Sequence, residues 1–498
     1  MRRPMLLNEL LSQIPDMEPG EYPQLRIEGI AYDSRRIKNG DLFVGIRGEK
    51  ADGASFAVQA VERGAAAIAS EESLNLETPV ATVLVKDARV FLAEAARVLF
   101  HDPAAQIALV GITGTNGKTT TTYLMDAIFR KAGLRSCLIG TTGMRIGKQQ
   151  FPCDRTTPES PDLLMFLRHA VMGGCTHGAV EVSSHALALK RVFATRFRLG
   201  IFTNLTQDHL DFHGDMESYY RAKRILFTDE GRNRIETAVI NRDDPYGRRL
   251  ASEATCPVLS YGFDPLAEVR AIEFHQRADG TDIVMATPEG PMEVKTGLLG
   301  RPNIYNVMAA VGASLSLKLA PDMVCMGIEG VEGVPGRMER VTAGQPFQII
   351  VDYAHTPDAL ENMLATVRAL PHGRLITVFG CGGDRDRGKR PLMGEIAARM
   401  SDLVIATSDN PRSEDPLEIL SEIEAGLRQG PAAYKLVVNR RHAIELAIKS
   451  AQAGDAVVIA GKGHENYQII GTRVYPFDDR AVARELIQKL PNARAVRY

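Results

Sequence analysis

The stretch "GITGTNGKTTTTYLMDAIFRKAG", residues 111–133, sets the architecture of the middle of this chain. The apolar run "IALVGI", residues 107–112, leads into it, as expected for a buried parallel strand, and an amphipathic run follows the glycines, which indicates a helix. Between the two, glycines allow backbone N–H groups to curl around an anion, and the start of the helix adds its positive end. The stretch therefore predicts a strand, a phosphate-binding loop and a helix.

The loop itself, "GTNGKTT", departs from the usual G-x-x-x-x-G-K-S/T pattern, because Ile112 stands where the first glycine is expected. Lys118 can still reach the β- and γ-phosphates of a nucleotide, and the Thr119 hydroxyl can bind Mg²⁺. The alternative is a plain glycine turn with a solvated lysine, and the strand before and the helix after argue against it. The ATP-binding candidates here are Gly114, Thr115, Asn116, Gly117, Lys118, Thr119 and Thr120.

Composition narrows the class of protein. The chain has 498 residues, 24% of them charged, and a net charge of −2, so there is no electrostatic case for a nucleic-acid partner. No stretch approaches the roughly 20 consecutive apolar residues of a membrane-spanning helix, and Asn8 and Glu9 interrupt the first apolar run, so we expect neither a signal peptide nor a membrane partner. The six cysteines form no CxxC pair, which favours free thiols in a cytoplasmic protein over disulfides or a zinc site.

The length predicts about three domains. Residues 1–103 indicate a small mixed α/β domain, and residues 104–335 alternate strands with helices, which implies a mostly parallel sheet behind the phosphate loop. Within the second domain, residues 257–297 indicate a β-rich insertion with Asp279-Gly280 as its hairpin turn. Residues 336–498 contain five more apolar strand candidates separated by helices. The expected fold is α/β, with a central phosphate-loop parallel-sheet domain and a C-terminal Rossmann-like domain.

Two segments downstream of the loop suggest a metal site. "EVSSHAL" puts Glu181 at the end of a predicted strand, and "FTNLTQDHLDFHG" does the same for Asp208 and His209. Ligands of open parallel sheets gather at these strand ends, where a carboxylate suits Mg²⁺ and an imidazole points to a second site that tolerates Mn²⁺. Taken singly, Glu181 fits a charge at a helix N-terminus equally well, and His209 a loop histidine with a backbone partner. Lys223, in "SYYRAKRILF", fits an ordinary surface lysine by spacing alone.

The order of the motifs adds a resemblance. The chain is similar, from about residue 33 to about residue 465, to the Mur ligases, the ATP-dependent amino-acid ligases of peptidoglycan synthesis. The resemblance rests on "GTNGKTT", "EVSSHAL", "TNLTQDHLDFHG", "YRAKRILF", "GRPNIYNVMAA", "VPGRMERV", "VDYAHTPDAL", "FGCGGDRDRGKRPLMG", "SDNPRSEDP" and "GKGHE". It is strongest to the branch that adds the third residue of the stem peptide.

That resemblance implies a reaction. ATP would phosphorylate the D-Glu side-chain carboxylate of UDP-MurNAc-L-Ala-D-Glu, and the amine of meso-diaminopimelate would attack the acyl phosphate. It implies a UDP-binding first domain, an ATP-binding second domain and an amino-acid-binding third domain that closes about residues 333–337. We expect a monomer. His209 and Glu465 are both conceivable acceptors of the amine's proton, and the sequence does not choose between them.

The resemblance also carries residue roles. Lys223 matches a lysine that reacts with CO₂ to become a carbamate, which would bind Mg²⁺ together with Thr119, Glu181 and His209. Ser34 matches a UDP-sugar contact, and the muramoyl-dipeptide contacts would be Thr156, Thr157, Ser183 and Arg191. Further ATP contacts would be Asn303, Asn306, Arg337, Asp352 and His355. Two positions depart from the family pattern: Leu189 stands where some members carry a polar contact, and Pro302 replaces the commoner phenylalanine.

The last two motifs suggest an amino-acid pocket. Arg412, in "SDNPR", and Arg385, in "GGDRDRG", both follow predicted strands, and guanidinium groups pair well with carboxylates. Glu465, in "GKGHE", can bind an ammonium group. These charges fit the two carboxylates and the amines of diaminopimelate. The related lysine-adding ligases usually lack the arginine that corresponds to Arg412. The alternative for Arg412 is a surface salt bridge. The full set of candidates is Arg385, Asp409, Asn410, Pro411, Arg412, Gly461 and Glu465.

Two rival functions remain. Folylpolyglutamate synthetase shares the ATPase core, but the N-terminal "DSRR" and "GDLFVGIRG" segments and the "DNPR" motif argue against it. A regulatory protein that has lost ligase activity is the other, and intact Lys118, Glu181, His209 and Lys223 argue against that.

Overall fold

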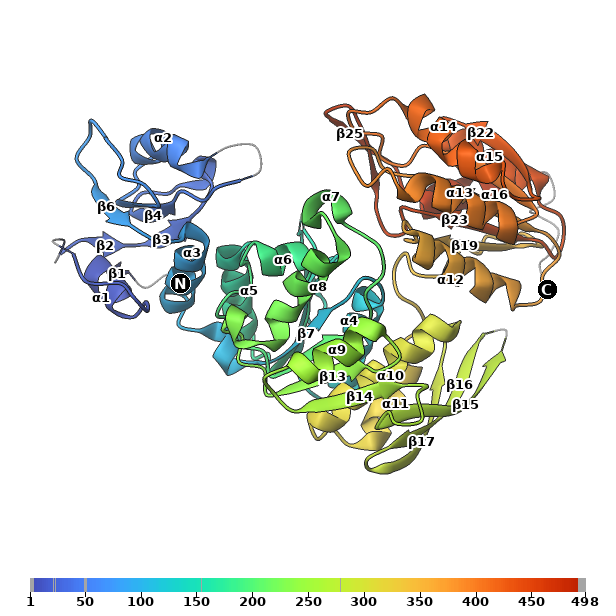
Figure 1. Cartoon of the computed structure of the whole chain (residues 1–498), viewed down its shortest axis with the longest axis horizontal. Coiled ribbons are helices and arrows are strands. Elements are labelled where there is room, and N and C mark those ends of the chain that lie inside the picture. The colour runs from blue at the N-terminus through green and yellow to red at the C-terminus, as the bar shows by residue number, and fades with distance from the viewer. Residues whose placement is uncertain are drawn as a thin grey trace.

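Three α/β units follow one another along the chain in the computed structural model, which describes residues 4–20, 22, 24–48, 52–153, 155–277 and 279–490 (Figure 1). Each unit has its own sheet, and the phosphate loop lies in the middle unit. No described helix is long and apolar enough to cross a membrane.

The N-terminal unit contains a four-stranded parallel sheet in the order β3-β4-β5-β6. Helix α3 (Ala88–Leu99) begins at Asp87, whose carboxylate accepts the backbone N–H groups of Arg89 and Val90, and its buried face joins a core shared with the middle unit. The other elements are β1 (Met5–Leu6), α1 (Leu7–Ser12), β2 (Arg26–Ile27), β3 (Gly29–Ala31), β4 (Asp41–Val44), α2 (Ala57–Glu62), β5 (Ala67–Ser70) and β6 (Ala81–Leu84).

The middle unit is built on an eleven-stranded sheet in the order β10-β9-β8-β11-β7-β12-β13-β14-β15-β16-β17. Strands β8 to β15 of that order run parallel, as predicted, and antiparallel hairpins extend both edges, so the sheet as a whole is mixed. The strands are β7 (Ala108–Thr113), β8 (Ser136–Gly140), β9 (Gly143–Ile146), β10 (Gln149–Phe151), β11 (His177–Glu181), β12 (Leu199–Phe202), β13 (Thr237–Asn241), β14 (Val258–Gly262), β15 (Val269–Arg277), β16 (Gly280–Thr287) and β17 (Gly290–Thr296).

Helices cover both faces of this sheet, which explains why its central strands read as continuous apolar runs. The predicted hairpin near residues 279–280 exists, but Gly280 is the first residue of β16 and pairs with Arg277, so it belongs to the strand and not to the turn. The helices are α4 (Lys118–Lys131), α5 (Ser160–Met172), α6 (Ser184–Ala188), α7 (Leu210–His213), α8 (Met216–Arg224), α9 (Pro245–Glu253), α10 (Arg301–Ser316) and α11 (Pro321–Glu329).

The C-terminal unit has a six-stranded sheet in the order β18-β19-β23-β20-β21-β22. Its five predicted strands are present and parallel, as in a doubly wound unit, and β18 adds an antiparallel edge. The elements are β18 (Glu339–Arg340), β19 (Gln348–Asp352), α12 (Pro357–Arg368), β20 (Leu375–Phe379), α13 (Lys389–Met400), β21 (Leu403–Thr407), α14 (Pro416–Leu427), β22 (Ala433–Val437), α15 (Arg440–Ser450), β23 (Ala456–Ala460), the hairpin β24 (Tyr467–Ile470) and β25 (Arg473–Pro476), and α16 (Asp479–Gln488).

Candidate active site

The phosphate loop connects β7 to α4 and is tightly packed. Gly117 has φ 86°, and a side-chain carbon there would lie 2.3 Å from Oδ1 of Asn306 on α10. Gly114 is equally confined, because the same addition would meet the Thr203 hydroxyl at 1.8 Å. Both positions therefore require glycine. Lys118 folds back over the loop, donating to the carbonyl oxygens of Gly114 at 2.9 Å and of Thr115 at 2.8 Å, and burial lowers its pKa.

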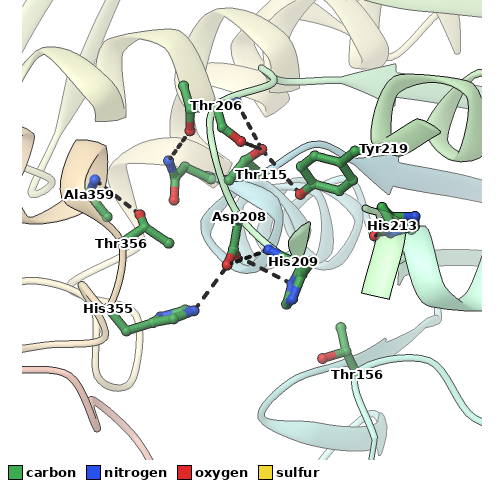
Figure 2. Close-up of polar contacts among 12 residues, drawn as sticks. Thr115, Thr156, Thr206, Asp208, His209, His213, Tyr219, His355, Thr356 and Ala359 are labelled. Atoms are coloured by element: carbon green, nitrogen blue, oxygen red, sulfur yellow. Dashed lines mark hydrogen bonds and ion pairs between the residues drawn. The ribbon is translucent and has the colours of Figure 1, made fainter. Parts of the chain in front are cut away.

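Side chains of neighbouring segments hold the remaining loop residues. Asn116 receives its support from both sides: its N–H donates to Oδ1 of Asn204 at 2.9 Å, and its amide donates to Asp358 on α12 at 2.7 Å. The Thr115 hydroxyl lies 3.2 Å from the Tyr219 hydroxyl, as Figure 2 shows. Thr120 is buried in the first turn of α4. The loop is thus bound to the C-terminal unit as well as to its own sheet.

Glu181, at the end of β11, lies directly beside the loop and is 1% exposed. Its Oε2 accepts the Thr119 hydroxyl at 3.1 Å and the Thr141 hydroxyl at 2.9 Å, and its Oε1 accepts the Thr141 N–H at 2.9 Å. The N-cap of the following helix is Ser183, so Glu181 is not a helix-capping charge. Thr141 was missed, although its position directly after a predicted strand is where ligands gather.

Lys223 is buried, contrary to what its spacing suggests. Its side chain is 1% exposed; its ammonium donates to the Gly114 carbonyl at 2.9 Å and lies 4.6 Å from the centre of the Tyr219 ring. Among the described residues it has no carboxylate ion-pair partner. Burial, followed by the charge of Lys118, lowers the pKa of Lys223 well below 10.5. A lysine in this environment favours its neutral amine form.

Asp208 and His209 form a second polar group near the loop, together with His355 (Figure 2). His209 has a left-handed backbone (φ 54°), and its Nε2 is 3.3 Å from Oδ2 of Asp208; Nε2 of His355, from the C-terminal unit, is 3.8 Å from the same oxygen. Burial lowers the pKa of His209 to about 3, so its imidazole is neutral. Burial alone would raise the pKa of Asp208, but His209, His355 and Lys389 hold it below its usual value.

The predicted metal ligands are only partly brought together. Thr119 and Glu181 are in direct contact, whereas His209 contacts Asp208 rather than Glu181. Within the part of the chain that the structure describes, no three His, Cys, Asp or Glu side chains are arranged to hold a metal ion.

The dipeptide candidates of the middle unit form one group beside Glu181. The Thr157 hydroxyl donates to the Glu181 carbonyl at 2.8 Å and accepts the Ser183 N–H at 3.1 Å. Arg191 donates to the Thr157 carbonyl at 3.3 Å and pairs at 2.9 Å with the buried Glu159. Thr156 accepts the Thr141 hydroxyl at 3.3 Å. Leu189, the departure noted above, is the C-cap of α6.

Ser34 lies apart from that group, on the N-terminal unit, where it donates to Gln59 at 2.6 Å. Its neighbours connect the two units. The Tyr32 hydroxyl donates to Asp162 on α5 at 2.6 Å, and Arg36 donates to the other oxygen of the same carboxylate at 2.9 Å. The segment around Ser34 is therefore bound to the middle unit, although Ser34 itself is not.

The remaining ATP candidates approach the loop from two sides. On α10, Asn306 donates to Asn303 at 2.9 Å and accepts the Thr121 hydroxyl at 3.3 Å. Pro302 lies in the first turn of that helix, where its missing N–H costs nothing. Arg337 arrives from the other side, donating to the Thr119 hydroxyl at 3.2 Å.

Asp352 and His355 flank Arg337 in the C-terminal unit. The Asp352 carboxylate accepts the backbone N–H groups of Met338 at 2.7 Å and Ala354 at 2.8 Å, and burial raises its pKa. Nδ1 of His355 lies 2.8 Å from the Tyr353 carbonyl, which leaves Nε2 directed at Asp208 (Figure 2). Asp352 therefore holds the segment that carries Arg337, and His355 connects the C-terminal unit to Asp208 of the middle unit.

Two arginines of the amino-acid pocket lie side by side. A side-chain carbon added at Gly382 would be 3.0 Å from Nη1 of Arg412 and 3.7 Å from Cγ of Arg385. Each donates to a backbone carbonyl, Arg412 to Gly383 and Arg385 to Asp384, both at 2.7 Å. Neither forms an ion pair with any described residue, so Arg412 is not a surface salt-bridge arginine. Burial, and then Arg385, lowers the pKa of Arg412.

The hairpin β24–β25, which was not predicted, supports the "SDNPR" segment. The backbone of Arg412 pairs with that of Ile469 and Gly471, Ile469 N–H donates to Oδ1 of Asn410 at 3.0 Å, and Gln468 donates to the Asp409 carbonyl at 2.7 Å. Pro411 packs against Gly383, and Gly461 (φ 116°) against Asp409, in both cases too closely for a side chain on the glycine. Asn410 and Glu465 are in contact at 3.0 Å.

Family models match three consecutive parts of the chain. They are described as Mur ligase family, catalytic domain, over residues 26–110; Mur ligase middle domain, over residues 112–314; and Mur ligase, glutamate ligase domain, over residues 336–463.

Individual proteins match over nearly the whole length. The UDP-N-acetylmuramoyl-L-alanyl-D-glutamate–2,6-diaminopimelate ligases of Geobacter metallireducens and Solibacter usitatus are each 47% identical to this chain; both alignments cover 97% of this chain, with 99% and 98% of the relatives. A solved structure of a ligase of the same name is 32% identical, with a TM-score of 0.68, 97% of this chain covered and 99% of that one. Folylpolyglutamate synthase of Mycobacterium tuberculosis shares the fold, with a TM-score of 0.64 at 19% identity over 80% of this chain and 95% of its own. Identity at the level of the first three, over almost the full length of both chains, shows that the chain belongs to the Mur ligase family.

Proposed function

We propose that this chain is the ATP-dependent ligase that adds meso-diaminopimelate to the D-Glu side-chain carboxylate of UDP-MurNAc-L-Ala-D-Glu in peptidoglycan synthesis. Relatives of that name are 44–47% identical to it over most of its length. The observation that carries the substrate assignment is the pair Arg385 and Arg412, two adjacent guanidinium groups without a carboxylate partner among the described residues.

ATP would bind on the phosphate loop. Its triphosphate would lie against the backbone of residues 114–120 and the first turn of α4, with Lys118 leaving its two loop carbonyls to contact the β- and γ-phosphates. Asn303 and Asn306 would lie near the adenine, and Arg337, Asp352 and His355 would complete the site from the C-terminal unit. The contact of Arg337 with Thr119 supports this, because it already reaches the loop from there.

The chemistry requires a better leaving group than oxide. Transfer of the γ-phosphoryl group to the D-Glu carboxylate gives ADP and an acyl phosphate; the diaminopimelate amine attacks, and the tetrahedral intermediate releases phosphate to leave the amide. Two anions must approach each other in the first step, so cationic groups between them lower its barrier. Lys118 and Arg337 are the chain's own cations at that position.

The oxygen donors Glu181 and Thr119, in contact beside the loop, fit Mg²⁺, which prefers oxygen ligands. When bound there, Mg²⁺ would neutralise the oxygens between which the phosphoryl group moves. Lys223 would contribute as a carbamate, and its burial and lowered pKa support this, because only a neutral amine reacts with CO₂. His209, neutral and next to Asp208, is the remaining candidate ligand.

The nucleotide-sugar dipeptide would extend from the first unit to the second. We propose residues 1–103 as the UDP-binding domain, with Ser34 as a contact, and residues 104–335 as the ATP-binding domain, where Thr156, Thr157, Ser183 and Arg191 would hold the muramoyl dipeptide. The cluster of these four beside Glu181 supports the assignment, since the acceptor carboxylate must reach the phosphate loop.

Residues 336–498 would be the amino-acid-binding domain. Arg385 and Arg412 would hold a carboxylate of diaminopimelate, Glu465 an ammonium group, and Asp409, Asn410, Pro411 and Gly461 would shape the pocket. We further propose that the enzyme acts as a cytoplasmic monomer.

The test is a panel of amino acids assayed for ADP formation with UDP-MurNAc-L-Ala-D-Glu present. We expect ADP only when the dipeptide precursor and meso-diaminopimelate are both supplied, with lysine and glutamate far poorer. Preference for lysine would contradict the substrate assignment, glutamate addition to a folate would support the folylpolyglutamate rival, and nucleotide binding without turnover would support the regulatory one.

A further inference from the structure

Lys462 is a fully buried lysine in the wall of the amino-acid pocket, and no role has been assigned to it above. It follows β23 directly, and its side chain is 0% exposed. A buried ammonium group is costly unless it is paired and hydrogen-bonded. Its partners therefore indicate what the lysine does.

Two partners of Lys462 belong to the pocket itself. Its ammonium donates to Oδ1 of Asn410 at 3.1 Å and to Oε2 of Glu465 at 3.0 Å, and it lies 5.5 Å from the centre of the Tyr467 ring. Asn410 in turn donates from Nδ2 to the same Oε2 at 3.0 Å. Lysine, amide and carboxylate thus form a closed triangle of hydrogen bonds.

The triangle determines which atoms face the substrate. Oδ1 of Asn410 accepts from a cation and from the Ile469 N–H, so the amide cannot reverse without putting donors against donors. Oε2 of Glu465 accepts two hydrogen bonds, while its Oε1 receives none from the part of the chain described here. One carboxylate oxygen is therefore held in place so that the other can meet an ammonium group.

Lys462 also contributes to the charge of the pocket. Three cationic side chains, Arg385, Arg412 and Lys462, lie near the carboxylates Asp409 and Glu465, and the Asp384 carboxylate also faces the two arginines. A diamino diacid with one amine deprotonated for attack carries two carboxylates and one ammonium group. The cations of the pocket therefore favour a substrate of net negative charge, and loss of Lys462 would make the pocket more negative by one charge.

We propose that Lys462 is a positioning residue that orients Glu465 and Asn410 for the incoming amino acid. This rests on the proposed function. Lys462 acts through its two partners and contacts no reacting atom.

The test compares KM for diaminopimelate with KM for ATP in Lys462→Met, Lys462→Arg and the control Lys449→Met, which alters an exposed lysine on α15. Lys462→Met should raise KM for diaminopimelate about tenfold or more, as expected for losing charge-assisted hydrogen bonds, and change KM for ATP less than twofold. Lys462→Arg keeps the charge but not the geometry, so it should fall between wild type and Lys462→Met. The control should match wild type in both constants.

A double-mutant cycle identifies the route of action. In a Glu465→Gln background, Lys462→Met should add less than threefold to KM for diaminopimelate, because the carboxylate it orients is gone. Equal changes in both KM values, no change in either, or additive effects in the cycle would overturn the proposal. Should Lys462→Met not fold, Lys462→Arg decides: a selective rise in KM for diaminopimelate supports the proposal and a parallel rise contradicts it. Wild-type enzyme inactive with diaminopimelate would instead overturn the proposed function.

Discussion

Replacing Arg412 by alanine tests the amino-acid pocket most directly. Arg412 forms no ion pair with a described residue, and burial together with the adjacent Arg385 disfavours its charge. A substrate carboxylate would relieve both penalties. A guanidinium–carboxylate contact of this kind contributes about 2–3 kcal/mol, which corresponds to a rise of about 30- to 150-fold in KM for diaminopimelate.

The same substitution should leave stability nearly unchanged. Alanine at φ 52° bears the same left-handed backbone cost that arginine already bears, so that cost cancels. The variant loses the hydrogen bond to the Gly383 carbonyl but also loses the repulsion from Arg385. These effects oppose each other, and the free energy of unfolding should change by less than about 1 kcal/mol.

The assay measures ADP release while diaminopimelate and ATP are varied separately, with thermal unfolding of each variant recorded in parallel. Arg428→Ala, which removes an exposed arginine paired with Glu424 in the same unit, is the control and should leave both constants unchanged. A rise in KM for ATP equal to that for diaminopimelate, or a rise below threefold, would refute the assignment of Arg412 to the pocket.

Three further outcomes are expected. Lys223→Ala should abolish turnover and regain part of it with short-chain carboxylic acids, whereas Lys449→Ala should be unaffected; full activity without rescue would exclude the carbamate role. Gly117→Ala should weaken ATP binding and lower the free energy of unfolding by more than about 1 kcal/mol, because the added carbon meets Asn306 and the backbone has a positive φ. The control Gly133→Ala has a positive φ but open space around it, so it should destabilise the protein less and leave ATP binding intact. Burial lowers the pKa of His185 and His213 to about 4, so between pH 6.5 and pH 4 the folded protein binds fewer protons than the unfolded chain. The unfolding temperature should therefore fall as the pH is lowered from 6.5 to 4. The fall should be less steep in His213→Gln, whereas His442→Gln, which alters an exposed histidine, should behave as wild type.

Most strands that the sequence predicted are buried on both faces, although β22 was also predicted and is largely exposed. Strands such as β13 and β23 are continuous apolar runs, and their bounds agree closely with the prediction. The hairpins β9–β10 and β24–β25 were missed because they are partly exposed and carry polar or mixed side chains. A local sequence pattern reveals a strand through its burial, and these hairpins lack such a pattern although their two strands are adjacent in the sequence.

The same limit applies to the site. Lys118 and Glu181 could be placed because Lys118 directly follows a glycine turn and Glu181 ends a strand, and the sequence reveals both. The burial of Lys223 could not, because its partner is the Gly114 carbonyl, more than a hundred residues away. Thr141 and Lys462 were overlooked for a similar reason, since their importance lies in the carboxylates they meet.

The support that β24–β25 gives to the "SDNPR" segment has a consequence for engineering. The conformation of this five-residue segment depends on backbone pairing with Ile469 and Gly471 and on the side chain of Gln468. Introducing only these five residues into a ligase that prefers another amino acid would transfer the side chains without the hairpin that positions them. A chimera that exchanges the hairpin along with the motif would transfer both.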